Sequence, residues 1–289
     1  MRILHVVPGL NEACNGISVA ARLIANEQGA DLVEARLFAR GKCDASQYDE
    51  VWVHSAWSPM VLRSCRRVLK LGKRLVRMAH ANYDPVRLKY HGWKKALAGP
   101  IERFFLRRAK TLIATCEAEK GWIESYLGRR CPPIALTDIK RFFKLNNLNL
   151  VNPVNPVKKD LNLLYLGRRH PLKGVEYLET AVRQIEKNSA YSASSRLCVK
   201  YISSAFGEEK EKVWNWCDIL VLPTLSENFG LVIAEALERG KRVITTDGAP
   251  AWGDGNTYGG RLIYLKGYRD GSPEKRVELL REALTTLMS

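Results

Sequence analysis

The sequence predicts an α/β protein built from two doubly wound parallel-sheet domains. Short apolar runs alternate with amphipathic segments through both halves of the chain, which is typical of parallel sheets covered by helices. The length of 289 residues suits two domains of about 150 residues each. Asn and Pro punctuate residues 144–156, which indicates a linker. We therefore expect one domain at residues 1–150 and a second at residues 151–289.

Six apolar runs in the first half, each followed by polar or turn residues, predict strands. They cover residues 3–7, 32–38, 51–55, 75–79, 111–115 and 134–137. Four intervening segments carry apolar residues at helical spacing and predict helices over residues 17–28, 59–71, 93–109 and 119–127. The alternation predicts a parallel sheet with helical crossovers.

The second half repeats this plan. Five apolar runs predict strands at residues 163–166, 197–202, 219–222, 242–245 and 262–265. Amphipathic segments predict helices at residues 175–186, 209–216, 229–239 and 274–287. The two halves share only this general α/β layout, and no short repeat connects them.

Composition excludes several classes of protein. No apolar segment reaches the roughly 20 residues that a membrane-spanning helix needs. The first residues predict a strand that runs into a turn rather than a signal peptide. The seven cysteines are scattered and form no C-x-x-C pair, so zinc and redox sites are not expected. A reducing cytoplasm is the expected location.

The positive charge is concentrated in the first half of the chain. Of the net +16, residues 1–150 contribute 26 Lys and Arg against 13 Asp and Glu, and most of the excess lies between Arg63 and Arg108. The segment 93–109 is aromatic, basic and amphipathic. Such a face favours anionic lipid headgroups, a phosphorylated glycan or nucleic acid, and ordinary solvated helices are the alternative.

Residues 218–247 predict a strand, a turn, a helix and a second strand in succession. Pro223 ends the first strand, and the turn places Ser226 or Asn228 at the N-cap of the helix. Glu235 lies in the apolar part of the helix, where a carboxylate is costly unless it is hydrogen-bonded. A pair between Glu235 and Arg239, with Glu227 as a solvated turn residue, is the simpler alternative.

The pattern of Glu227 followed by Glu235 resembles the E-x7-E signature of glycosyltransferase family 4, which has the GT-B fold of two Rossmann-like domains facing across a cleft. The resemblance implies that Glu227 contacts the transferred sugar and that Glu235 holds the ribose of a nucleotide-sugar. It also implies that Asn228, Phe229, Gly230 and Leu231 present backbone amides to the sugar and phosphate. The first domain would then bind the acceptor, and the second the nucleotide-sugar.

A pair of cations gives a second match to the family. Gly167-Arg168 is followed by Lys173-Gly174 at the start of a predicted helix. Arg binds phosphate bidentately and Lys adds a point charge. In the family, both cations hold the donor diphosphate and neutralise the leaving nucleotide. A basic loop without a ligand is the alternative.

Two features of the first half resemble the family more weakly. Residues 9–17 form a glycine-containing loop in which Gly16 would approach the donor. His80 follows a predicted strand and matches the family histidine that approaches the sugar. His54 resembles another strand-end histidine and is assigned a supporting role, and His170 falls inside the phosphate loop.

The resemblance implies a retaining glycosyltransferase that uses a UDP- or GDP-linked sugar and no other cofactor. The expected acceptor is a bacterial surface glycan of the lipopolysaccharide core, O-antigen or capsule type, or a lipid-linked glycan. No D-x-D pair occurs, so we expect no metal. We expect peripheral contact with an anionic membrane, at the inner face of the cytoplasmic membrane, and no nucleic-acid partner. A GT-B sugar-nucleotide epimerase and a basic nucleic-acid-binding protein are the alternatives.

Overall fold

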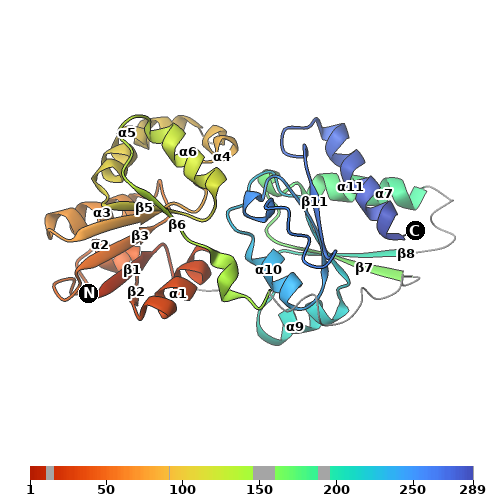
Figure 1. The fold of residues 1–289 in the computed structure, drawn as a ribbon, viewed down its shortest axis with the longest axis horizontal. Coiled ribbons are helices and arrows are strands. Elements are labelled where there is room, and N and C mark those ends of the chain that lie inside the picture. Colours follow the sequence, from red (N-terminus) through yellow and green to blue (C-terminus); the bar gives the residue numbers. More distant parts are fainter. Residues whose placement is uncertain (11–15, 91, 146–159, 188–195, 289) are drawn as a thin grey trace. The chain divides into compact units, whose positions relative to one another are not determined.

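The computed structural model describes residues 1–10, 16–90, 92–145, 160–187 and 196–288. The chain divides into two compact units, Met1–Ile139 and Lys140–Ser289 (Figure 1). Both units contain a parallel sheet with helices on its two faces, as the alternation of apolar runs and amphipathic segments predicts.

The first unit contains a six-stranded sheet in the order β2-β1-β3-β4-β5-β6. Its strands are β1 Ile3–Val7, β2 Asp31–Glu34, β3 Glu50–His54, β4 Arg74–Met78, β5 Thr111–Ala114 and β6 Ile134–Leu136. All adjacent pairs are parallel, with Val6 opposite Val53 in the register of β1 and β3. The two Val side chains are fully buried, in the core that the sheet forms with its covering helices.

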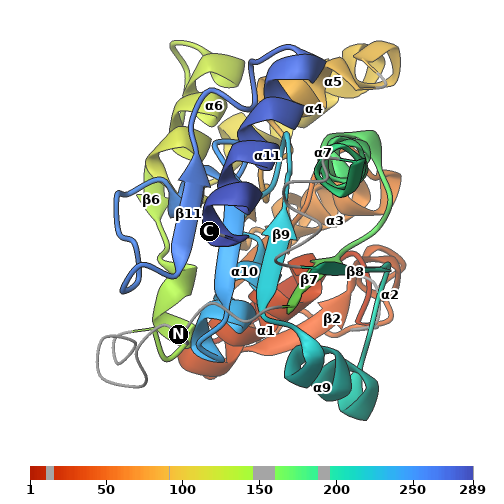
Figure 2. The same cartoon turned by 90° about the vertical axis from the view of Figure 1, so that its right-hand side faces the viewer.

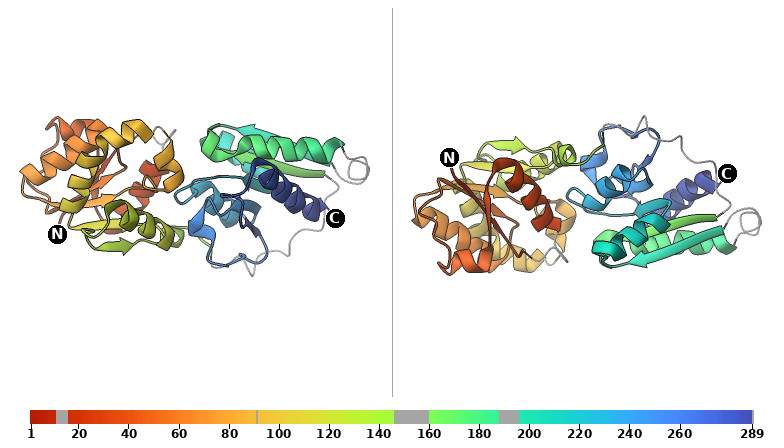
Figure 3. Two further views of the ribbon diagram at one scale, coloured as in Figure 1. Left: turned by 90° about the horizontal axis from the view of Figure 1, so that it is seen from above. Right: turned by 90° about the horizontal axis from the view of Figure 1, so that it is seen from below.

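The helices of the first unit cover the sheet unequally. They are α1 Gly16–Gln28, α2 Ala35–Ala39, α3 Pro59–Lys70, α4 Pro85–Lys89, α5 Gly92–Arg108 and α6 Glu117–Leu127. Figures 1 and 3 show α1 on one face of the sheet and α3, α5 and α6 on the other. Right-handed crossovers explain this arrangement. The connection from β1 to β2 runs toward one edge of the sheet, whereas the later connections run toward the other edge, so their helices lie on opposite faces.

The second unit contains a five-stranded sheet in the order β11-β10-β9-β7-β8. Its strands are β7 Asp160–Leu166, β8 Arg196–Ile202, β9 Ile219–Leu222, β10 Arg242–Thr246 and β11 Leu262–Leu265. Its helices are α7 Val175–Lys187, α9 Gly207–Trp216, α10 Leu231–Glu238 and α11 Pro273–Met288. Helices α7 and α11 pack side by side on one face, and α9 and α10 lie on the other (Figures 1 and 2).

Two expectations about the fold need correction. The strand predicted over residues 32–38 ends at Glu34, and α2 follows, because Ala35 and Phe38 are spaced to bury one side of a helical turn. The units divide at Ile139 rather than at residue 150. The segment after Ile139 belongs to the second unit, since Lys140 pairs with Asp254 at 2.6 Å. The predicted linker at residues 144–156 lies largely outside the described residues.

Among the described helices, none is long and apolar enough to cross a membrane.

Candidate functional site

The sheet of the second unit changes its winding direction between β9 and β7. Strand β7 leads to β8 on one side, and the chain then returns past β7 to β9 and continues away from it. Ligands of open parallel sheets bind outside the carboxyl ends of the strands at such a point. Strand β7 ends at Leu166 and β9 at Leu222, so both predicted motifs begin there.

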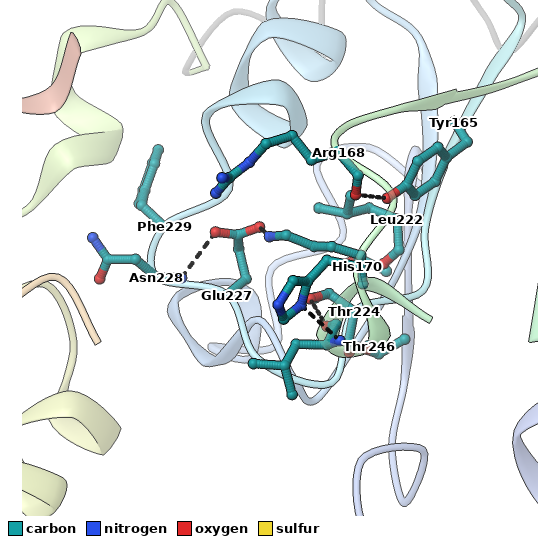
Figure 4. A network of polar contacts seen from close by, with 12 residues as sticks. Tyr165, Arg168, His170, Leu222, Thr224, Glu227, Asn228, Phe229 and Thr246 are labelled. Carbon is teal, nitrogen blue, oxygen red and sulfur yellow. Dashed lines mark hydrogen bonds and ion pairs between the residues drawn. The ribbon is translucent and has the colours of Figure 1, made fainter. Parts of the chain in front are cut away.

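Glu227 forms an ion pair with Lys173 across these two loops. Both side chains are largely buried, with 17% of each exposed. Glu227 Oε1 also accepts a hydrogen bond from the Asn228 backbone N–H at 3.1 Å. Arg168 is exposed and its guanidinium points toward Glu227 (Figure 4). One carboxylate and two cations from separate loops therefore form a single cluster.

Close backbone packing holds the two loops together. The Leu225 N–H donates to the Leu172 carbonyl at 2.9 Å, and the Glu227 N–H donates to the Gly248 carbonyl at 2.7 Å. A Cβ at Gly174, whose φ is +62°, would lie 2.2 Å from the Pro223 carbonyl oxygen. A side chain at this position would force the loops apart, so the glycine is required for the geometry of the cluster.

Helix α10 begins later than the sequence predicts. Leu231 is its first residue and Gly230 is its N-cap, with φ 72° and no side-chain cap, so neither Ser226 nor Asn228 caps it. The left-handed conformation of Gly230 turns the chain into the helix and brings Ile233 and Glu227 against the glycine. The amino end of α10 therefore lies beside the Glu227 cluster, with its positive dipole end toward it.

Phe229 is fixed between aromatic rings of the same unit. It lies 5.2 Å from Trp252 and 6.1 Å from Phe143, measured between ring centroids. The Trp252 indole N–H donates to the Phe229 carbonyl at 2.5 Å. The loop that follows β10 therefore holds the backbone that precedes α10.

Glu235 pairs with Lys210 of helix α9. The Lys210 ammonium lies 2.8 Å from Oε1 and 2.7 Å from Oε2 of Glu235. The alternative pair with Arg239 is wrong, because the Arg239 guanidinium contacts the Glu235 backbone carbonyl and pairs with Glu211. Lys210 precedes Glu235 by 25 residues, so no local spacing pointed to it.

Three histidines of the first unit form a hydrogen-bonded chain across the sheet. His5 Nδ1 lies 2.8 Å from His54 Nε2, and His54 Nδ1 lies 2.9 Å from His80 Nε2. At the other end, His5 Nε2 lies 2.8 Å from Gln28 Oε1. Each ring therefore shares a hydrogen bond with its neighbour along the chain. His5 lies in no recognisable motif, so its place in this chain could not be expected from the sequence.

Burial keeps this chain neutral. All three rings are shielded from solvent. Loss of hydration lowers the pKa of His5 to about 4 and that of His80 to about 3. Burial, the neighbouring histidines and Arg77 hold the pKa of His54 well below its ordinary value. Each imidazole therefore carries a single proton at neutral pH, with one nitrogen as donor and the other as acceptor.

The backbone around His80 is strained. His80 and Ala81 have φ values of 56° and 57°, and Ser55 and Trp57 after the neighbouring strand have 73° and 65°. Non-glycine residues with such positive φ values are uncommon and cluster at functional sites.

Gly16 is the exposed first residue of α1, the helix that follows β1 of the same sheet. Residues 11–15 of its loop lie outside the described residues.

The structure thus groups the predicted site residues in two sets. Arg168, Lys173, Glu227 and the start of α10 lie together in the second unit, and His170 accepts a hydrogen bond from the Leu172 N–H beside them. Glu235 lies farther along α10 with Lys210. Gly16 and His80 belong to the first unit. Among the described residues, no group of three or more His, Cys, Asp or Glu side chains is arranged to hold a metal ion.

Two doubly wound domains, one of which carries a cationic cluster at a helix amino end, define an α/β protein of the GT-B fold class. Residues 10–136 match the family "Glycosyl transferase 4-like domain", and residues 160–270 match "Glycosyl transferases group 1". The matches fall on the two units in turn. The chain therefore belongs to the group 1 glycosyltransferases of family 4, which confirms the predicted family and enzyme class.

Solved structures with the same fold extend over nearly the whole chain. A sucrose-phosphate synthase from Thermosynechococcus elongatus is 13% identical, with a TM-score of 0.66 over 99% of this chain and 90% of its own. An α,α-trehalose-phosphate synthase (UDP-forming) from Burkholderia vietnamiensis is 10% identical, with a TM-score of 0.68 over 100% and 92%. These similarities confirm the fold class.

A similar sequence comes from Klebsiella pneumoniae. An uncharacterized 41.2 kDa protein in its cps region is 23% identical over 227 residues. The match spans 70% of this chain and 61% of the relative, so this chain covers less than two thirds of that relative's length.

Proposed function

We propose that this protein is a retaining glycosyltransferase that moves a sugar from a UDP- or GDP-linked donor to a glycan acceptor. The observation that carries the proposal is the cluster of Arg168, Lys173 and Glu227 beside the amino end of α10. It places two cations and a helix dipole at the switch point of a parallel sheet, where a diphosphate would be stabilised. The UDP-forming relative, which shares the fold, supports this type of donor.

In the proposed reaction, Arg168 and Lys173 neutralise the diphosphate that leaves as the glycosidic bond breaks. Preorganised charge of this kind usually contributes more to catalysis than any other single effect. Glu227 would contact the transferred sugar, and Glu235 would accept hydrogen bonds from the ribose hydroxyls after Lys210 shifts. Asn228, Phe229, Gly230 and Leu231 would line the sugar and phosphate. The acceptor hydroxyl would attack the face that the leaving group vacates and pass its proton to the departing diphosphate, and no metal would take part.

His80 is proposed to contact the sugar from the first unit. The support is the position of His80 just after β4, where the family histidine is expected, and the left-handed backbone at His80 and Ala81. Gly16, at the start of α1, would let backbone approach the donor.

The proposed acceptor is a bacterial surface glycan of the lipopolysaccharide core, O-antigen or capsule type, or its lipid-linked precursor. The support is the relative encoded in a cps region and the basic charge of the first unit. The proposed location is the cytoplasm, at the inner face of the cytoplasmic membrane.

Product analysis with a panel of UDP- and GDP-sugars tests the proposal. The protein is incubated with each donor, with and without a lipid-linked glycan extract, and released nucleoside diphosphate and product anomer are measured. Acceptor-dependent release with the donor's anomeric configuration supports it. Conversion of the sugar without an acceptor would indicate an epimerase, and inversion would exclude the retaining mechanism.

A further inference from the structure

Helix α5 of the first unit exposes an apolar stripe. Its members are Trp93, Leu97, Ile101 and Phe104, whose exposed fractions are 66%, 74%, 52% and 48%. At about 100° per residue, these four positions lie within roughly 80° of the helix circumference. Along the axis they extend over about 16 Å. The helix therefore presents a continuous apolar surface to its surroundings rather than scattered single side chains.

The opposite face of α5 is fixed to the core of the unit. Glu102 is fully buried and pairs with Arg77 of β4 at 2.6 Å. Its Oε1 also accepts a hydrogen bond from the Tyr83 hydroxyl at 2.5 Å. Phe105 and Leu106 are buried beside it. The helix is thus held in one orientation, and the stripe cannot turn inward without leaving a buried charge unpaired.

Basic side chains border the stripe, and no exposed acidic residue occurs within α5. The cations of the helix are Lys94, Lys95, Arg103, Arg107 and Arg108, whereas its single acidic residue is the buried Glu102. Lys94 lies over the Trp93 ring at 5.4 Å, and Arg108 lies over the Phe104 ring at 4.9 Å. Apolar rings covered by basic side chains are suited to the interface of a bilayer, where acyl chains meet anionic headgroups.

A pocket of about 650 Å³ lies at the carboxyl end of the stripe. It is lined by Pro100, Phe104, Arg107, Arg108, Ala109, Arg130, Cys131 and Pro132. Three of these lining residues are arginines, and none of them carries a carboxylate. Guanidinium groups bind phosphate in bidentate fashion, so the pocket suits the phosphate of a lipid headgroup.

We propose that this surface of α5 docks the protein on an anionic lipid bilayer, with the apolar stripe inserted at the level of the headgroups and a lipid phosphate in the arginine pocket. Charge complementarity and the apolar stripe favour a bilayer over a soluble acidic partner, which would not need exposed Trp93 and Leu97. The proposal extends the lipid-linked acceptor proposed above. Its test requires no turnover, so its failure would leave the transferase assignment standing.

The experiment is flotation of the full chain with two kinds of vesicle. One contains phosphatidylcholine alone, and the other contains phosphatidylcholine and phosphatidylglycerol in equal parts. We expect flotation only with the anionic vesicles. Neutralising Arg107, Arg108 and Arg130 to Gln is expected to weaken it by roughly 100-fold, since each basic residue near an anionic surface contributes about fivefold.

A second variant, Leu97→Ser with Ile101→Ser, is expected to weaken flotation at least about tenfold through loss of apolar burial. Two matched controls are expected to float as the wild type does. One is Arg63→Gln, Arg66→Gln and Lys70→Gln, which removes three exposed cations of α3. The other is Leu71→Ser with Leu136→Ser, which removes two exposed apolar side chains.

Equal flotation on both vesicle types, or flotation on neither, would overturn the proposal, and so would equal losses in the α3 control and the arginine variant. Size-exclusion chromatography adds a further outcome. If the wild type is a dimer without lipid and Leu97→Ser with Ile101→Ser makes it monomeric, a second copy covers α5 and the bilayer assignment is wrong.

Discussion

Lys173 and Glu227 lie 54 residues apart in the sequence, and their side chains form an ion pair at the carboxyl ends of β7 and β9. Both side chains are mostly removed from solvent, so the pair has lost much of its hydration. Such a pair is costly where it serves only stability. In the proposed mechanism the two partners have different roles: Lys173 contacts the diphosphate, and Glu227 contacts the sugar.

The Glu227→Gln variant tests this division of roles. It keeps the shape of the side chain and removes the charge that contacts the sugar. We expect turnover to fall by about 100- to 1,000-fold, the usual effect of losing one transition-state contact. The affinity for free nucleoside diphosphate, measured by calorimetry, should change much less. Glu179→Gln, which affects a surface pair with Arg169, is the control. Equal losses in turnover and nucleotide affinity would place Glu227 on the diphosphate instead.

The Glu235→Ala variant tests the proposed ribose contact. Loss of a hydrogen bond to a charged group typically costs about 1.5–3 kcal/mol, so the affinity for nucleoside diphosphate should fall by about 10- to 150-fold. Glu211→Ala is the matched control, because Glu211 pairs with Arg239 at the surface of the same helical layer. Unchanged affinity in a folded Glu235→Ala protein would make Glu235 a structural partner of Lys210.

Chelation tests the expectation that the reaction needs no metal. We expect full activity in excess EDTA, because charge on the leaving diphosphate is balanced by Arg168 and Lys173 in the proposed mechanism. The measurement is the initial rate of nucleoside diphosphate release before and after dialysis against EDTA. Loss of activity that Mg²⁺ or Mn²⁺ restores would contradict the expectation.

The histidine chain predicts an acid-sensitive fold. The pKa of His5 is about 4 in the folded protein against an ordinary value of 6.5, so the unfolded state binds more protons between these values. Stability should therefore be complete above about pH 6.5 and fall as the pH drops toward 4. Each such histidine lowers the free energy of unfolding by up to about 1.4 kcal/mol for each pH unit of acidification in this window.

The His5→Gln variant isolates this contribution. Thermal denaturation is followed across the window, with each protein referred to its own stability at neutral pH. The slope of the variant should be shallower than that of the wild type, because one titrating group is removed. Identical slopes would show that His5 titrates in the folded protein as it does in the unfolded one.

Periodicity in the sequence was sufficient to predict most of the fold. The central strands of both sheets are runs rich in Val, Ile and Leu between turns, and all of them begin and end within three residues of the expected bounds. The exception at Glu34 arose because Ala35–Ala39 is apolar at a spacing that fits either a strand or a short helical turn. The local sequence pattern does not distinguish a strand from a helical turn here. The burial of Phe38 in the folded protein does.

The site could be predicted only where its residues belong to a local motif. Arg168, Lys173, Glu227 and Glu235 each lie in such a motif. Lys210 and His5 do not, because their partners come from other elements and only the tertiary packing brings them together. The start of α10 was also missed, since Gly230 replaces a side-chain cap with a left-handed turn.

Calorimetric titration with UDP and GDP, for the wild type and for Arg168→Ala with Lys173→Ala, tests most directly whether the second unit holds the donor diphosphate at this cluster. The control is Arg169→Ala with Arg183→Ala, which removes two neighbouring exposed cations. We predict that the wild type and the control bind at least one of the two nucleotides equally. The cluster variant should bind at least about 100-fold more weakly, because two charged contacts are lost. Equal affinity of the cluster variant and the wild type would contradict a donor diphosphate held by Arg168 and Lys173.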